Sequence, residues 1–362
     1  MKKSLMAFAG LAALNAGPAL AQSSVTLFGV VDATLAHGSG SASSKTFLTN
    51  SGFSSSRVGF RGTEDLGGGM SASFWLEAGV NNDNGAGGTT NTNNQSTGAA
   101  PPAAGGQGLT FNRRATVSLA GNWGELRLGR DYTPQYWTLG LMDPFGSNGV
   151  GTSQTVNSLT VLTAVRASNT IGYLLPRNLG GFYGQAQYYL GENNSNAGTP
   201  AGSTKNDGSG YGLRLGFASG PFDVVLAHGL TRYAVGDFHQ NNIGAAYDFG
   251  VVKLVAHFSF DKNDIATSGK GRGYLVGGLI PVGAGQIRLS YSRYQIELAA
   301  AKPTATKFAI GYNYNLSKRT ALYATFAHVS NSGGSGQTLN GATLASPNDS
   351  SSGYDFGIRH SF

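Results

Sequence analysis

The chain has 362 residues, of which 12% are charged and 56 are glycine, and its formal charge is +7. Soluble domains carry about 25% charged residues, so this composition argues against an ordinary soluble domain. Cysteine is absent, which excludes a fold held together by disulfides. Most basic residues are arginines scattered singly along the chain, whereas nucleic acids are bound by clustered ones. We therefore expect no nucleic-acid partner.

The first residues have the features of an export signal. Two lysines precede an apolar, alanine-rich run over 4–16, and a small-x-small Ala-Leu-Ala pattern follows. The alternative is an N-terminal membrane anchor, but the apolar run is shorter than the roughly 20 residues that a membrane span needs. The sequence predicts cleavage after Ala21, a signal peptide over 1–21 and a mature chain that begins at Gln22 and forms one domain over 22–362. Without the two signal lysines the mature chain has 23 basic and 18 acidic residues, a net charge of +5.

Apolar and polar side chains alternate from the start of the mature chain to its last residue. Clear examples occur over 25–35, 70–78, 182–189, 252–261 and 308–316. Alternation with period two indicates strands with two different faces, and segments of about ten residues match the strands of a membrane barrel. This pattern predicts an all-β fold, a transmembrane antiparallel β-barrel that takes up the single domain over 22–362.

The predicted connections fall into two length classes that alternate along the chain. The short ones are 65–69, 121–124, 219–221, Gly250 and 317–320, and the long ones, rich in Gly, Asn, Ser and Thr, are 39–51, 80–108, 191–208 and 331–352. Outer-membrane barrels have tight periplasmic turns and long external loops. A soluble β-sandwich also has regular strands and turns, but it does not account for this alternation.

Five short motifs carry a resemblance to a known family. They lie at 24–32, 56–67, 128–134, 315–320 and 357–362. Together they resemble the Gram-negative trimeric porins of the betaproteobacterial and neisserial type, over essentially the whole mature chain. The resemblance implies sixteen strands, a homotrimer, and a third loop folded into the lumen as a constriction. It also implies that Phe362 is a signal for the outer-membrane assembly machinery and its periplasmic chaperones, with lipopolysaccharide as the surrounding lipid.

Arginines recur at positions that the pleat directs into the lumen. If Val58 and Phe60 face lipid, their neighbours in sequence face inward. An arginine on the lipid face at the bilayer midplane costs about 2–4 kcal/mol, so inward placement is favoured. The arginines with inward parity are Arg57, Arg61, Arg114, Arg127, Arg214 and Arg288.

Three further arginines depend on the resemblance. Arg113 and Arg130 have outward parity by simple alternation, and the resemblance still places them near the constriction, which requires a bulge or a strand end. Arg166, just before the next predicted strand, resembles another constriction arginine and is equally compatible with a solvated loop position.

The segment 131–163 is too long for a turn and is expected to be the inward-folded third loop. Its Asp-Pro-Phe-Gly sequence at 143–146 resembles the family's acidic turn, so Asp143 is expected to face the arginines and create a transverse field across the pore. The alternative is a surface loop with a proline-stabilised turn. Asp32 and Glu77 are the other acids expected in the lumen, and the positive side should dominate.

Enzyme signatures are scarce in this sequence. The six histidines are scattered, and neither a G-x-S-x-G elbow nor a phosphate-binding loop occurs, so we expect no cofactor, no metal and no catalytic residues. The predicted function is a water-filled porin for passive diffusion of small hydrophilic solutes and ions, with a preference for anions. The alternatives are a barrel that acts mainly as an adhesin or receptor through its loops, and a barrel hydrolase with a hidden Ser-His pair.

Overall fold

The computed structural model describes residues 24–93, 108–154, 162–196, 202–265 and 269–362. The predicted signal peptide, with its cleavage site between Ala21 and Gln22, lies outside these ranges. Every helix within them is too short or too polar for a membrane crossing.

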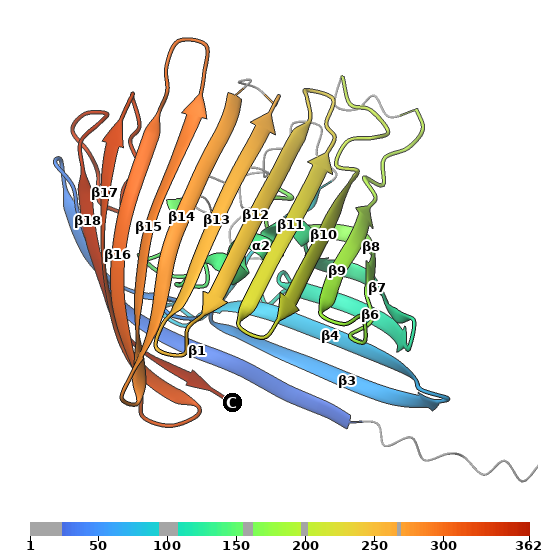
Figure 1. The fold of residues 1–362 in the computed structure, drawn as a ribbon. Helices are drawn as coiled ribbons and strands as arrows, with labels where there is room; N and C mark the ends of the chain where they lie inside the picture. The colour runs from blue at the N-terminus through green and yellow to red at the C-terminus, as the bar shows by residue number, and fades with distance from the viewer. Residues whose placement is uncertain (1–23, 94–107, 155–161, 197–201, 266–268) are drawn as a thin grey trace, which may run out of the picture.

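The described residues form one closed antiparallel sheet (Figure 1). The wall strands are β1 (Ser24–Ser39), β3 (Arg57–Gly67), β4 (Met70–Asn81), β6 (Arg114–Gly121), β7 (Gly124–Tyr132), β8 (Arg166–Leu174), β9 (Phe182–Tyr189), β10 (Gly210–Ser219), β11 (Phe222–Thr231), β12 (Phe238–Asp248), β13 (Lys253–Asn263), β14 (Gly269–Val282), β15 (Gly285–Glu297), β16 (Thr304–Asn315), β17 (Thr320–Ser332) and β18 (Ser351–Ser361). Pairing of β1 with β18, from Val30 opposite Ser361 to Ser39 opposite Ser352, closes the sheet. Closure leaves no free edge, as a barrel in lipid requires.

Two short strands complete the eighteen in the sheet. β2 (Ser44–Asn50) and β3 pair with successive parts of the same edge of β1, so together they form one interrupted wall strand. β5 (Ala86–Gly87) is a two-residue pairing on β4. Eighteen minus these two leaves sixteen wall strands in the described part of the chain, which confirms the predicted all-β, sixteen-stranded barrel.

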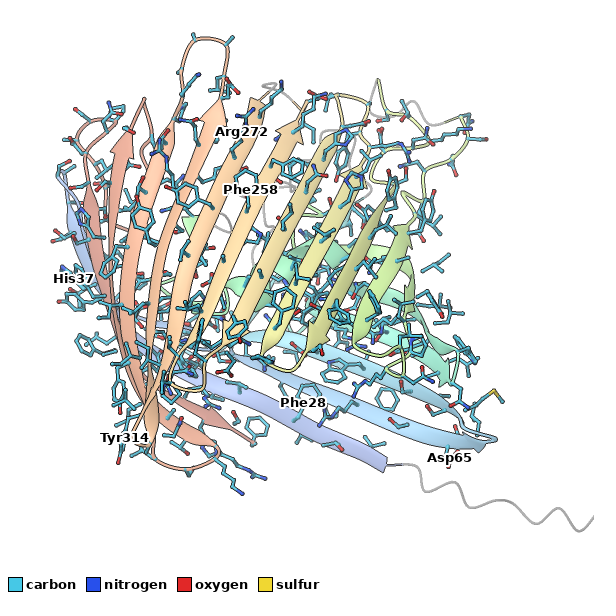
Figure 2. All side chains as sticks on the ribbon, in the orientation of Figure 1. Phe28, His37, Asp65, Phe258, Arg272 and Tyr314 are labelled. Carbon is cyan, nitrogen blue, oxygen red and sulfur yellow. The ribbon has the colours of Figure 1, made fainter. Side chains whose placement is uncertain are left out.

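The two faces of the wall differ as the alternation predicted. On β13, Leu254, Phe258 and Phe260 point outward and are exposed, whereas His257 and Ser259 point inward and are buried. Figure 2 shows Phe258 and Tyr314 among the side chains on the outer surface. An apolar outer face and a polar inner face are the arrangement of a barrel that spans lipid around an aqueous interior.

The prediction of a long loop over 39–51 is wrong in detail. β1 continues to Ser39 and β2 begins at Ser44, so the reversal takes only the residues between them. A hairpin extended beyond the membrane needs paired backbone but no apolar face, which is why its polar sequence looked like a loop. The chain leaves the wall a little later, over 51–56, and returns to it at Arg57.

The connection between β7 and β8, residues 133–165, is the third external loop and is called L3 below. Its described parts include α2 (Pro134–Met142), which lies against the inner faces of β10, β11 and β12. Figure 1 shows α2 behind these strands, inside the barrel. The structure therefore confirms an inward-folded L3 and rules out the alternative of a surface loop.

Inward-facing glycines on six of the sixteen wall strands make room for L3. A Cβ atom on Gly277 would lie 2.5 Å from Cγ of Pro144, and one on Gly353 would lie 2.9 Å from Cγ2 of Val150. The glycines that L3 covers in this way are Gly212, Gly229, Gly244, Gly277, Gly311 and Gly353, on β10, β11, β12, β14, β16 and β18. Part of the high glycine content is thus explained by close approach of a loop to the wall.

Buried side chains and hydrogen bonds hold L3 in place. Met142 packs with buried apolar residues of the inner wall, and Phe145 and Val150 belong to a second buried cluster with residues of β16 and β17. The Val150 N–H donates to Oδ2 of Asp355 at 2.7 Å, and Nζ of Lys307 donates to the Val150 carbonyl at 3.1 Å. L3 is therefore a fixed partition of the lumen.

Candidate functional site

A cavity of about 300 Å³ lies between L3 and the opposite wall, and we call it the constriction. Its L3 side is formed by Tyr136, Trp137, Gly140, Leu141, Gly146 and Asn148, and its wall side by Ser54, Ser55, Arg57, Glu77, Arg113, Tyr132 and Arg166. Uncharged side chains thus face a wall that carries three arginines and one glutamate.

The charged side chains of this wall form one network. Nε of Arg113 lies 2.6 Å from Oε1 of Glu77, and Nε of Arg57 lies 3.6 Å from the same oxygen. The Tyr132 hydroxyl accepts hydrogen bonds from Nη2 of Arg113 and Nη2 of Arg166, both at 2.6 Å. Three cations and one anion leave the network with a net charge of +2.

The segment 51–56 builds the rest of the wall side. Asp32 holds it, because its Oδ2 accepts hydrogen bonds from the backbone N–H groups of Phe53 at 2.9 Å and Ser54 at 2.6 Å. The Tyr323 hydroxyl donates to Oδ1 of Asp32 at 2.5 Å. The Ser55 carbonyl in turn accepts a hydrogen bond from Nη1 of Arg57 at 2.7 Å. We expected Asp32 as an acid of the lumen, but it is fully buried, so it positions this segment and presents no charge to the passage.

A second layer of arginines lies next to the constriction. The indole of Trp75 has Arg61 over it at 5.2 Å and Arg114 at 4.6 Å, measured from Cζ to the ring centroid. Asp131 pairs with Nη1 of Arg127 at 2.7 Å and with Nε of Arg114 at 3.7 Å. Cations over an indole face are stabilised by its quadrupole. The predicted Arg61, Arg114 and Arg127 therefore gather on one side of the lumen.

Arg214 and Arg288 contact the aromatic side chains of L3 and do not line the constriction. Arg288 is buried, with Cζ 4.3 Å from the ring centroid of Phe53 and 4.9 Å from that of Phe145. Arg214 has Cζ 6.0 Å from the Trp137 ring. Both point inward, as their parity predicted, and both lie next to L3.

The expectation for Asp143 requires a correction. Its side chain is buried and accepts hydrogen bonds from the N–H groups of Phe145 at 2.9 Å and Ser153 at 3.0 Å. Burial raises the pKa of this carboxyl, and those two N–H groups and Lys307 oppose the rise. Asp143 therefore closes the turn of L3, as aspartate does in many turns, and it does not face the arginines across the pore.

Arg130 also departs from the position that the resemblance implied. Its guanidinium donates to the Asn112 carbonyl at 2.6 Å, to Oδ1 of Asn91 at 2.6 Å and to Oγ of Ser168 at 2.8 Å. It does not line the constriction. The pairing of β7 with β8 is irregular between Gly129 and Asp131, and the hydrogen bonds of Arg130 to Asn91 anchor the loop after β4.

Arg113 lines the constriction because it lies at the end of a strand, one of the two possibilities that the sequence left open. It directly precedes β6, which begins at Arg114, so the alternation of the strand does not fix its direction. Sequence reasoning missed Tyr132, Tyr136 and Trp137 as lining residues. The available signal was their position on either side of Pro134, where a strand gives way to a helix.

Among the described residues, no group of three or more acidic or histidine side chains is placed to hold a metal ion. The arrangement is instead a cavity with a charged wall inside a barrel whose outer face is apolar, which defines a channel of the outer membrane.

Comparison with known proteins agrees with this class. A family model described as Gram-negative porin matches residues 6–334. Outer membrane porin protein 32 of Delftia acidovorans is 37% identical over all of both chains, and an outer membrane porin protein of Bordetella pertussis is 28% identical over 91% of this chain and 95% of its own length. The chain belongs to the Gram-negative porin family, and it is an outer-membrane porin.

Solved structures show the same fold. The anion-selective porin from Comamonas acidovorans is 34% identical, with a TM-score of 0.78 over 94% of this chain and 100% of that chain. OmpT of Vibrio cholerae, in a trimer form, has a TM-score of 0.66 over 94% of this chain and 99% of that chain at 14% identity, which shows a shared fold alone.

Proposed function

We propose that this porin passes small hydrophilic solutes by passive diffusion and prefers anions. One observation carries the preference: the constriction wall has three arginines for one glutamate, and its arginines are more exposed than that acid. The side chain of Arg57 is 27% exposed, against 8% for Glu77. In a narrow aqueous passage with low-dielectric walls, fixed positive charge raises the local concentration of anions and repels cations.

The similarity to a porin described as anion-selective supports the same proposal. Arginine stays protonated at physiological pH, so the fixed charge is permanent. At 0.15 M salt the Debye length is about 8 Å, comparable to the dimensions of a narrow pore. The preference for anions should therefore weaken as the salt concentration rises.

Reversal potentials in potassium chloride gradients across a planar bilayer test the proposal. We expect a potential of the sign set by chloride permeation, larger in dilute than in concentrated salt. A potential set by potassium in dilute salt would overturn it. Swelling of liposomes in sugar solutions separately tests for an open lumen, which a barrel acting only as a receptor would lack.

We further propose that the porin is a homotrimer embedded among lipopolysaccharide. Its signal peptide is removed between Ala21 and Gln22 during export. Periplasmic chaperones and the outer-membrane assembly machinery, which reads Phe362, then help it to fold and insert. Membership of the Gram-negative porin family supports this assembly. N-terminal sequencing of the mature protein tests the cleavage site, and the mass of the detergent-solubilised, unheated protein tests the trimer. A monomeric mass in mild detergent would contradict the trimer.

A further inference from the structure

The outer surface of β13 and β14 changes from apolar to basic near the end that carries the long loops. On β13 the outward residues Phe258 and Phe260 are followed by Lys262, and on β14 Lys270 and Arg272 precede Tyr274. Figure 2 shows Arg272 above Phe258 on this face. Aromatic side chains gather at membrane interfaces, so the three cations lie at the level of the outer-leaflet headgroups.

A cavity of about 400 Å³ opens on this surface, and we call it the outer cleft. Its lining includes Phe258 and Phe260 as an apolar part and Lys262, Lys270 and Arg272 as a cationic part. Asp261 also lines it, but this carboxyl is buried on the inward side of β13 and its Oδ2 accepts a hydrogen bond from the Tyr294 hydroxyl at 2.8 Å. A cavity of about 530 Å³ lies beside it and shares Asn241 and Phe260 with it. The apolar part of its outward lining is formed by Leu213, Leu215, Leu226 and Ile243.

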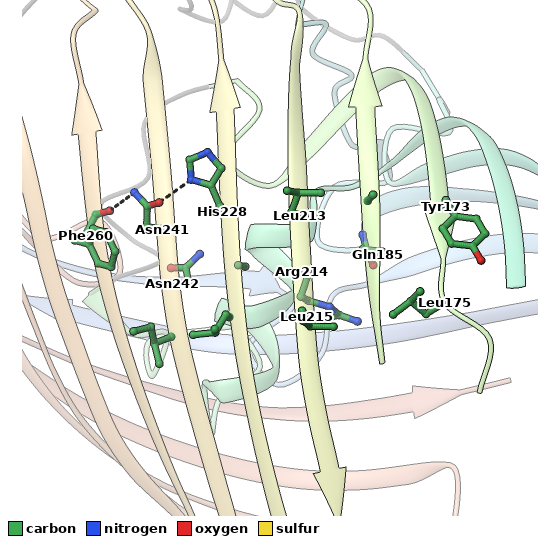
Figure 3. A pocket seen from close by; sticks show the side chains of 14 residues that line it. Tyr173, Leu175, Gln185, Leu213, Arg214, Leu215, His228, Asn241, Asn242 and Phe260 are labelled. Carbon is green, nitrogen blue, oxygen red and sulfur yellow. Dashed lines mark hydrogen bonds between the residues drawn. The ribbon is translucent and has the colours of Figure 1, made fainter. Parts of the chain in front are cut away.

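Figure 3 shows the polar upper part of this second cavity. Nδ1 of His228 lies 2.7 Å from Oδ1 of Asn241, and Nδ2 of Asn241 donates to the Phe260 carbonyl at 3.0 Å. These side chains point outward, where the middle of a lipid-facing strand would carry apolar residues. The surface therefore presents polar and cationic groups above apolar grooves.

The cations of the outer cleft are incompletely neutralised. Lys262 and Lys270 are directly opposite each other in the register of β13 and β14, and like charges at such positions destabilise a sheet. Lys262 forms an ion pair with Asp264 at 2.5 Å. Glu297 is directly opposite Lys270 on β15, but it pairs with Lys302 of the next loop instead. Within the residues that the structure describes, Lys270 and Arg272 have neither an ion pair nor a hydrogen bond from their side chains.

We propose that the outer cleft is a docking site for the phosphorylated disaccharide headgroup of lipopolysaccharide, an inference that rests on the proposed placement of the porin among this lipid. Lys270 and Arg272 bind a phosphate group, and acyl chains lie along Phe258, Phe260 and the neighbouring apolar groove. Charge complementarity carries the choice of occupant, because the outer leaflet supplies a lipid with phosphates directly above its acyl chains. Arginine and lysine form strong, charge-assisted hydrogen bonds with phosphate.

Lipid titration of the intact porin in detergent, followed by native mass spectrometry, tests the site. The probes are lipid A with both phosphates and the same lipid A after enzymatic removal of the phosphates, each with a chelator present so that no divalent cation bridges the groups. We expect the phosphorylated lipid to bind at least about ten times more tightly, as expected for the loss of strong charge-assisted contacts. The double variant Lys270→Gln/Arg272→Gln should lose this difference.

The matched control is Lys318→Gln/Arg319→Gln, which removes two exposed cations from the short turn at the opposite end of the barrel. It should bind both lipids as the unmodified porin does. Unchanged phosphate discrimination in the Lys270/Arg272 variant overturns the proposal. An equal loss of binding for both lipids, or a change of oligomeric state, also overturns it. Either outcome would show that the two cations act in folding or in a protein contact. Unchanged conductance of the variant keeps this result separate from the proposed channel function.

Discussion

Arg113 and Glu77 form an ion pair of 2.6 Å on the wall of the constriction, and the acid is the more buried partner. The side chain of Glu77 is 8% exposed, against 14% for Arg113. Trp75 covers the carboxylate further, since its Nε1–H donates to Oε2 of Glu77 at 3.0 Å. A solute in the passage therefore meets guanidinium groups before it meets the carboxylate, although both charges are present.

Replacing Glu77 with glutamine should increase the preference for anions. The change removes the one acid that lines the constriction within the described residues and raises the net charge of the wall network from +2 to +3. It also leaves two arginines without their ionic partner, which destabilises a partly buried network. Reversal potentials and thermal unfolding measure the two effects. Glu192→Gln in an external loop is the control, and an unchanged reversal potential in Glu77→Gln would show that this acid does not act on permeating ions.

Replacing Arg57 and Arg113 together with glutamine should move the reversal potential toward zero. The network would then keep Arg166 and Glu77, whose charges cancel. Arg130→Gln is a matched control, since Arg130 lies outside the constriction and binds the loop after β4. If Arg130→Gln changed the selectivity as much as the double variant, Arg130 would act on permeating ions. Its place near the constriction, as the family resemblance implied, would then be correct.

Phe362 is expected to matter for assembly more than for transport. Its backbone N–H and carbonyl exchange hydrogen bonds of 3.1 Å with Gly29 of β1, at the seam where the last and first strands meet. Deleting Phe362 should reduce the amount of folded porin in the outer membrane several-fold, while precursor synthesis and export continue. Phe362→Tyr, which keeps a terminal aromatic ring, should restore it. Equal amounts of heat-modifiable barrel in the deletion and the unmodified strain would refute a role in assembly.

The barrel was predictable because each wall strand meets two environments. Period-two alternation records lipid on one side of β13 and polar neighbours on the other, and it needs no knowledge of partners. The polar hairpin of β1 and β2 was not predictable in this way, because water surrounds both of its faces. Parity predicted inward positions for Arg57, Arg61, Arg114 and Arg127, and in the structure Arg57 lines the constriction while the other three lie beside Trp75 or Asp131.

The constriction was harder to predict because its geometry depends on contacts between distant segments. Arg113 lies one residue before β6, where parity has no meaning, and strand boundaries are the least certain part of a pattern. Asp143 was placed by resemblance to an acidic turn, but turn aspartates commonly bind backbone N–H groups. The row of inward glycines was visible in the sequence, whereas its partner, L3, appears only in the structure.

Neighbouring glycines on β14 allow a matched test of the contact between L3 and the wall. A Cβ atom on Gly277 would lie 2.5 Å from Cγ of Pro144 and 2.7 Å from the Leu289 carbonyl oxygen. A Cβ atom on Gly278 would meet nothing closer than Cδ2 of Leu254 at 3.6 Å, an ordinary van der Waals distance. The two positions have the same secondary structure and opposite faces.

Gly277→Ala should therefore destabilise the porin by about 1–3 kcal/mol, the usual penalty for overpacking, and Gly278→Ala should be nearly neutral. The added methyl group pushes Pro144 away from the wall, and the same turn carries Gly146, which lines the constriction. We expect a lower single-channel conductance for Gly277→Ala alone. Thermal unfolding and bilayer recordings measure both effects. Equal stability and equal conductance of the two variants would show that L3 does not depend on this contact.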